Sequence, residues 1–238
     1  MRTIAALTGK EFRSYFHSPI AYIYLVVFLV FTSWFFFRGF FVMNVASMRA
    51  FFSLMPWVFL FLLPAVTMRL WAEEQKLGTM EVLMTWPVRE HEAVLGKFFA
   101  SLGLLAVSLV LTFPLAATVF LAGDPDPGPV LTGYLGLLFM GGAYLAIGLF
   151  ASSLTENQIV AFITGVFLTF TLFVIGEGFV VVALPSWLAP LFSWLGLGAH
   201  FSSIGRGVID SRDVVYYLSV IFFFLYLNVR RLESRRWS

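Results

Sequence analysis

The sequence predicts an all-α membrane protein with six transmembrane helices, because long stretches of the chain carry no charge. Only 12% of the 238 residues are charged, about half of the quarter that is usual in a soluble domain. A helix of about 20 residues crosses a bilayer, and backbone groups in lipid must be satisfied within each segment, which favours helices. The composition therefore argues against a soluble enzyme, a disordered tail or a nucleic-acid-binding protein.

The uncharged runs predict the spans in chain order. They cover residues 20–37, 50–68, 98–123, 127–155, the first part of 157–209, and 214–229. The last run is only 16 residues long, so we expect the sixth span to include a flank. Residues 184–213 are apolar but are broken by prolines and glycines. We expect short re-entrant or interfacial helices there, between spans five and six.

Residues 2–17 precede the first span and have the pattern of an amphipathic interface helix, which Ser18-Pro19 ends. Such a helix lies on the membrane surface, either as an anchor or as a contact for a partner. We do not expect a cleaved signal peptide, because the next apolar run is too long and no small-residue cleavage site follows it. Apolar and basic side chains occupy opposite faces, Ile4, Leu7, Phe12, Tyr15 and Phe16 against Arg2, Lys10, Arg13 and His17.

The basic residues predict the orientation of the chain. Six spans place both termini on one side, together with eleven of the fifteen basic residues, and leave four on the other side. Basic residues gather on the cytoplasmic side of membrane proteins. We therefore expect one transmembrane domain over residues 1–238 in the cell (inner) membrane, with both termini in the cytoplasm and segment 184–213 on the extracytoplasmic side.

The cytoplasmic loop 69–97 concentrates polar chemistry, with nine of the 28 charged residues in 29 positions. Gly78 is typical of the end of one helix, Thr79 of the N-cap of a second, and Pro87 stops the second helix. Methionine and leucine at helical spacing beside carboxylates suit docking into a groove of a cytoplasmic protein, although ordinary charges flanking two spans would look similar. The candidate contact residues are Glu73, Glu74, Gly78, Thr79, Met80, Glu81, Leu83, Met84 and Pro87.

Two further features of the spans are candidates for packing and for transport. Small residues in the fourth span let helices approach closely, either within the bundle, which we favour, or at a dimer seam. Glu177 lies near the outer end of the fifth span, either as a wetted interfacial carboxylate, which its position favours, or as a ligand near the pathway exit. The packing candidates are Gly141, Gly142, Ala146, Gly148 and Ser152.

The sequence contains no candidate catalytic, cofactor or metal site. Neither Gly9-Lys10 nor Gly96-Lys97 belongs to a phosphate-binding loop, because both lack the upstream glycine and the following serine or threonine. His91-Glu92 lacks the second histidine of a zinc motif, since position 95 is leucine. The absence of cysteine excludes thiolate ligands. We therefore do not expect an enzyme.

The loop residues resemble the signature of ABC-2 type transporter permeases, namely Glu73-Glu74, Gly78-Thr79, Glu81, Pro87 and Gly96-Lys97. The C-terminal part is similar to a narrower branch, associated with gliding motility and with nitrous-oxide-reductase maturation. The residues that carry this second similarity are His200-Phe201, residues 206–210, Arg212-Asp213 and residues 233–237.

The resemblance implies the permease subunit of an exporter. ATP and Mg would be bound by separate cytoplasmic ATPase subunits, which the coupling helix of loop 69–97 would contact, with the helix 2–17 alongside. A second permease subunit, identical or different, would complete a dimer in the lipid bilayer, and an accessory extracytoplasmic protein is a further candidate partner. The alternative interpretation is a membrane scaffold or assembly factor without transport of its own. A secondary carrier is disfavoured, because the middle of each span lacks charge.

Overall fold

The computed structural model describes residues 2–43, 47–80, 88–208 and 210–236, and within these ranges it contains helices and no strands. The prediction of an all-helical protein is confirmed. Among the described residues, five helical segments are long and apolar enough to cross a membrane, which fits a multi-pass membrane protein. They are Pro19–Val42, Arg49–Lys76, Glu90–Ala122, Pro127–Ser153 and Ser211–Ser234. The fifth expected span is a shorter apolar helix, Gln158–Val174, so the count of six spans stays a prediction.

Two of the long apolar segments consist of two consecutive helices, and the last span is longer than its uncharged run. The segment 49–76 divides at Met68 into α3 and α4, and the segment 90–122 divides at Thr112 into α6 and α7. The helices are α1 (Arg2–His17), α2 (Pro19–Met43), α3 (Arg49–Thr67), α4 (Arg69–Lys76), α6 (Glu90–Leu111), α7 (Phe113–Ala122), α8 (Pro127–Ser153), α9 (Gln158–Val174), α10 (Gly178–Ala183), α11 (Ala189–Leu195), α12 (Leu197–Ile204) and α13 (Ser211–Arg236).

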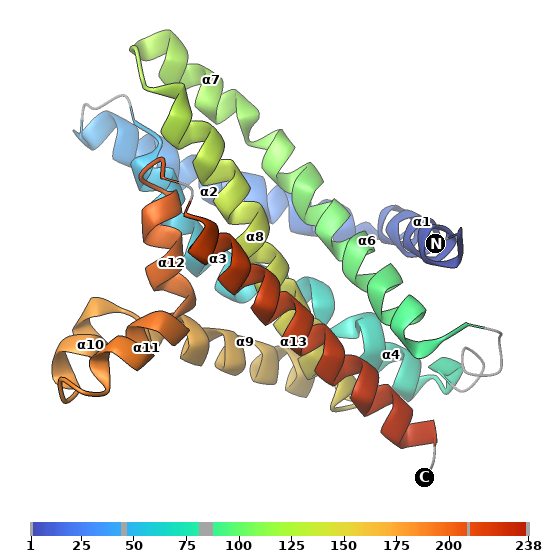
Figure 1. Ribbon diagram of the computed structural model, residues 1–238. Helices are drawn as coiled ribbons and strands as arrows, with labels where there is room; N and C mark the ends of the chain where they lie inside the picture. Colours follow the sequence, from blue (N-terminus) through green and yellow to red (C-terminus); the bar gives the residue numbers. More distant parts are fainter. Residues whose placement is uncertain (1, 44–46, 81–87, 209, 237–238) are drawn as a thin grey trace.

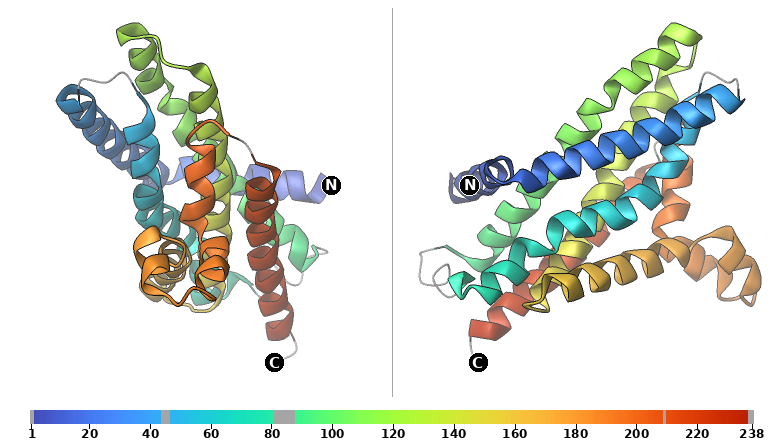
Figure 2. Two further views of the ribbon diagram at one scale, coloured as in Figure 1. Left: turned by 60° about the vertical axis from the view of Figure 1, so that its left-hand side comes forward. Right: turned by 180° about the vertical axis from the view of Figure 1, so that it is seen from behind.

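Helix α8 is the centre of the bundle, and it packs against α3, α6, α9 and α13 (Figure 1). Its side chains are the most completely buried of the five long segments. Asp126 caps its N-terminus by accepting a hydrogen bond of 2.9 Å from the backbone N–H of Gly128. The rear view in Figure 2 shows α2, α3 and α9 following one another across the opposite face.

The segment between α9 and α13 contains three short helices, α10, α11 and α12, of six to eight residues. Residues 184–208 contain no long helix, as the prolines and glycines predict. Helix α12 packs against α8, α9 and α13, whereas α10 and α11 lie at the C-terminal end of α9 (Figure 1). The position of this segment relative to a membrane stays a prediction.

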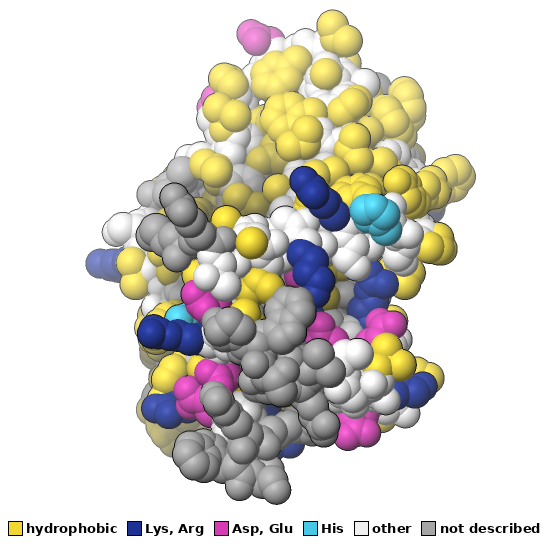
Figure 3. Space-filling model, turned by 90° about the vertical axis from the view of Figure 1, so that its right-hand side faces the viewer, with side chains coloured by type: hydrophobic (Ala, Val, Ile, Leu, Met, Phe, Trp, Pro, Cys, Tyr) yellow, Lys and Arg dark blue, Asp and Glu magenta, His cyan; other side chains and the backbone are white. Residues whose placement is uncertain are grey.

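The start of α1, the end of α13 and α4 lie at the same end of the bundle, which we call the charged end (Figure 1). Figure 3 looks at this end and shows basic and acidic side chains gathered in the lower half, with apolar side chains above them. Helices α7 and α12 lie toward the other end. The fold therefore brings α1, α4 and the start of α6 together.

Candidate functional site

The charged end contains a buried lysine that joins three helices. Lys97 of α6 is only 3% exposed. Its Nζ lies 2.6 Å from Oε1 of Glu74 in α4 and 3.3 Å from Oε1 of Glu11 in α1. The same ammonium group lies 4.9 Å from the ring centroid of Trp71 in α4, a cation–π distance. We call Glu11, Trp71, Glu74 and Lys97 the lysine cluster.

The charges of the lysine cluster are balanced only in part. A buried ammonium group is stable only when it is paired, and here two carboxylates share one cation. The second carboxylate oxygen of Glu74 is also buried and has no hydrogen-bond partner among the described residues. The cluster is therefore sensitive to any movement of α1 or α4, because either movement changes the pairing of Lys97.

Glycine residues of α6 allow α1 to approach closely enough for this pairing. A Cβ atom on Gly96 would lie 2.8 Å from Cβ of Leu7, and a Cβ atom on Gly103 would lie 3.2 Å from the ring of Phe12. Leu7 and Phe12 belong to the apolar face that the sequence predicts for residues 2–17. In the structure this face packs against α6, together with the buried Tyr15.

Replacing Gly96 with alanine should therefore push α1 away from α6. We expect G96A to lower the free energy of unfolding by about 1–2 kcal/mol through overpacking. The matched control is G9A, because a Cβ atom on Gly9 of α1 meets no atom within 4 Å and alanine is the better helix former by about 1 kcal/mol. Thermal unfolding should thus separate the two variants in opposite directions, and equal midpoints would contradict this packing.

The junction of α3 and α4 is held by Ser152 at the end of α8. Its hydroxyl oxygen accepts hydrogen bonds of 3.1 Å from the backbone N–H groups of Trp71 and Ala72. It donates one of 2.8 Å to the carbonyl oxygen of Met68. A side chain inserted into the helical hydrogen-bond ladder produces a kink, and a hydroxyl group accommodates two donors and one acceptor. Ser152 therefore fixes where α4 begins.

The candidate contact residues of the loop occupy different environments. Glu73 is half-buried, and its side chain has no ion pair among the described residues, whereas Glu74 faces Lys97. Gly78 has φ +70°, the left-handed conformation of a helix C-terminus, as predicted. Thr79 donates a hydrogen bond of 3.4 Å to the carbonyl oxygen of Glu74. Met80 is 7% exposed and belongs to the core, so it is not part of an exposed docking face.

Four of the candidate loop residues lie outside the described residues: Glu81, Leu83, Met84 and Pro87. Their proposed role at a contact with another protein stays a prediction.

The small residues of α8 pack against other helices of the same chain. A Cβ atom on Gly141 would overlap Leu105 of α6, and one on Gly148 would overlap the hydroxyl oxygen of Thr67 in α3. A Cβ atom on Gly142 would lie 3.2 Å from Ile221 of α13. Ala146 and Ser152 are buried as well. These contacts are the close approaches that small residues permit between membrane helices.

A comparison with known families identifies the family of the chain. Residues 20–204 match the family described as ABC-2 family transporter protein. The chain belongs to this family. It is therefore a permease component of a transporter, embedded in the membrane by several helices. A comparison with curated proteins finds no match.

The part of this ABC-2 transporter protein that matches the family includes α2 to α12, whereas α1 and α13 lie outside it. The lysine cluster thus links the matched region to α1 through Glu11. Sequence reasoning missed this role of Lys97, although the loop motif includes Gly96-Lys97. Two features of the sequence pointed to this role. Gly96, directly before Lys97, permits a close helix contact, and Glu11 is an acidic residue on the basic helix 2–17.

Glu177 follows α9 and lies beside the first turn of α12, next to Gly198. It lines a cavity of about 370 Å³ together with Arg49, Trp57 and Arg206. Burial raises the pKa of the Glu177 carboxyl group above its ordinary value. In this ABC-2 transporter protein Glu177 lies at the start of α10, at the end of the bundle opposite the lysine cluster (Figure 1). Its candidate role at a pathway exit stays a prediction.

Proposed function

We propose that the chain is the permease subunit of an ABC exporter and that a separate cytoplasmic ATPase drives it through α4 and the loop that follows. The observation that supports this proposal most directly is the lysine cluster. It ties α4, the helix that leads into the loop, to α1 and to the long segment that begins with α6. A force on the loop would therefore reach two other helices at once.

The two contacts of α4 give it the properties of a lever. Its first turn is bonded to Ser152 of α8, and its middle is paired with Lys97 of α6. A displacement of α4 consequently has to move both α6 and α8 or break these bonds. We infer that ATP-driven motion of the partner shifts the bundle around the pathway by this route.

The orientation and assembly follow from the same proposal. The charged end faces the cytoplasm, because eleven of fifteen basic residues belong to the termini and the loop side. The ATPase subunits hold ATP and Mg, and a second permease subunit, identical or different, completes the transporter in the inner membrane. Segment 184–213 then lies at the extracytoplasmic end, where an accessory protein would find it. The C-terminal motifs favour the gliding-motility and nitrous-oxide-reductase-maturation branch.

Two neighbouring glutamates test the proposed contact. We expect E73K to weaken co-purification with the ATPase about tenfold while leaving thermal unfolding unchanged, because Glu73 has no ion pair to lose among the described residues. E74K should instead lower thermal stability, because it places a second cation beside the buried Lys97. The measurements are quantitative pull-down with the ATPase and thermal unfolding of each purified variant.

The outcomes separate this function from the alternative. If E73K retained full ATPase binding and ATP-dependent transport, the coupling contact would have to lie elsewhere. A chain that purifies from its native membrane with no ATPase would support the membrane scaffold or assembly factor instead.

A further inference from the structure

A cavity at the end of the bundle opposite the lysine cluster brings two arginines together. Its volume is about 370 Å³, and residues of α3, α9 and α12 line it. Arg49 at the start of α3 and Arg206 just after α12 both line this cavity, together with the carboxyl group of Glu177. We call it the arginine cavity.

The two arginines give the arginine cavity an excess of positive charge. Neither guanidinium group forms an ion pair with a described residue, and Glu177 forms none either. Nε of Arg206 donates a hydrogen bond of 3.1 Å to the backbone carbonyl oxygen of Ser202. Because arginine is always charged, two cations line the cavity with a single carboxylate. The arginine cavity therefore attracts an anion.

Aromatic rings supply an apolar wall beside these charges. Phe52 of α3, Phe173 of α9 and Phe201 of α12 line the arginine cavity and are buried. Trp57 of α3 packs edge to face on Phe173 at a centroid distance of 5.0 Å and stays 44% exposed. Ligand cavities measure about 300–1,000 Å³ and combine apolar and aromatic walls with a few polar groups that orient the ligand. The arginine cavity has this composition and this size.

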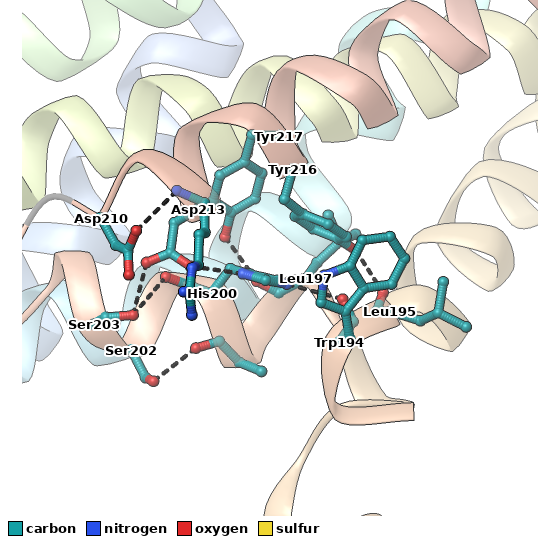
Figure 4. Close-up of polar contacts among 12 residues, drawn as sticks. Trp194, Leu195, Leu197, His200, Ser202, Ser203, Asp210, Asp213, Tyr216 and Tyr217 are labelled. Carbon is teal, nitrogen blue, oxygen red and sulfur yellow. Dashed lines mark hydrogen bonds and ion pairs between the residues drawn. The ribbon is translucent and has the colours of Figure 1, made fainter. Parts of the chain in front are cut away.

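Polar contacts to α13 hold the α12 wall of the arginine cavity in place (Figure 4). Ser203 donates a hydrogen bond of 2.8 Å to Asp213, and Nδ1 of His200 lies 2.7 Å from the other carboxylate oxygen of Asp213. At the start of α12, the carbonyl oxygen of Leu197 accepts a hydrogen bond of 2.7 Å from Tyr217. These contacts fix α12 along its length. Binding would therefore not require this helix to become ordered, which favours affinity.

We propose that the arginine cavity binds the terminal phosphate group of an amphiphile, whose apolar part lies on the aromatic wall. A planar guanidinium group binds two oxygen atoms of one anion. One arginine thus occupies both oxygens of a carboxylate, whereas a terminal phosphate group has three strong acceptor oxygens and can serve two arginines. The inference concerns binding by this chain alone, so it does not depend on the proposed ATPase contact.

Isothermal titration of the purified full chain with dihexanoyl phosphatidic acid, in a neutral detergent, tests this inference. We expect R49Q and R206Q each to weaken binding about tenfold, the loss of one charge-assisted contact. R49K should lose only about threefold, because lysine keeps the charge without the planar fork. E177Q should strengthen binding about threefold, since it removes an opposing charge from the same cavity, where screening over about 8 Å is incomplete.

The matched controls are R38Q and R212Q. Arg38 and Arg212 complete the set of four basic residues that we expect on the extracytoplasmic side, and both are exposed, but neither lines the arginine cavity. Their replacement should change the affinity by less than about twofold. If either control weakened binding as much as R49Q, general surface charge would explain the attraction and the proposal would fail.

Two further probes separate the parts of the ligand. Dihexanoyl phosphatidylcholine has the same apolar chains without a terminal phosphate group, and inorganic phosphate has the anion without the chains. We expect each to bind about tenfold more weakly than phosphatidic acid. Equal affinity for phosphatidylcholine would overturn the phosphate assignment, and equal affinity for inorganic phosphate would overturn the role of the aromatic wall.

The gain expected for E177Q keeps the inference testable if an arginine variant does not fold, because misfolding cannot strengthen binding. Thermal unfolding of R49Q and R206Q should match that of the unaltered chain, since both side chains are exposed and have no ion pair to lose among the described residues. An unchanged or weakened affinity of E177Q would contradict the proposed anion site.

Discussion

Lys97→Met is expected to lower the free energy of unfolding by about 3 kcal/mol, the cost of removing one partner from a buried ion pair. Methionine fills a similar volume but leaves Glu11 and Glu74 facing each other without a cation. The contact with Trp71 would also lose its charge. For a chain of this length, such a change corresponds to a midpoint of thermal unfolding roughly 6–12 °C lower.

Tryptophan fluorescence of the purified protein in detergent measures this change, and K76M is the matched control. Lys76 belongs to α4 as well, but its side chain is exposed, so we expect a midpoint within about 1 °C of the unaltered chain. The triple variant E11Q/E74Q/K97M should recover part of the loss, because it removes the unpaired carboxylates. If K97M melted like K76M, the lysine cluster would not hold the three helices together.

The sequence predicts those parts of the fold that the bilayer dictates. Uncharged runs indicated the long apolar helices, because a charge within lipid is costly wherever it occurs in a helix. Gly78 indicated the end of α4, because its left-handed conformation favours glycine. Both inferences use only neighbouring residues, so they need no knowledge of how the helices pack.

The sequence does not predict contacts between residues far apart in the chain. Lys97 directly precedes the uncharged run 98–123, yet its partner Glu11 is 86 positions away, and their pairing depends on how α1 crosses α6. Ser152 appears as one more small residue, although it bonds to backbone groups about 80 positions earlier. His200 and Asp213 are 13 positions apart in the sequence, and they meet because α12 folds back onto the start of α13. Tertiary packing creates each of these sites, and the periodicity of apolar residues along the chain contains no information about that packing.

Gly148→Ala is expected to destabilise the protein by about 2 kcal/mol, because α8 and α3 are in direct contact at this position. The new methyl group would overlap the hydroxyl oxygen of Thr67, and it would lie 3.6 Å from the Cα atom of Pro64. Thr67 cannot easily turn away, since its hydroxyl donates a hydrogen bond of 3.1 Å to the carbonyl oxygen of Leu63. Overpacking here would also strain the start of α4, because Ser152 lies one helical turn further along α8.

A second substitution distinguishes this contact from a general effect of alanine in α8. T67A removes the overlapping oxygen, so the double variant G148A/T67A should unfold close to T67A alone, with a coupling energy of about 1–2 kcal/mol. Thermal unfolding of the four proteins of this cycle measures the coupling. Additive effects of the two substitutions would mean that Gly148 and Thr67 do not meet. Strong coupling would place the junction of α3 and α4 against α8, the contact through which a movement of α4 has to pass into the bundle.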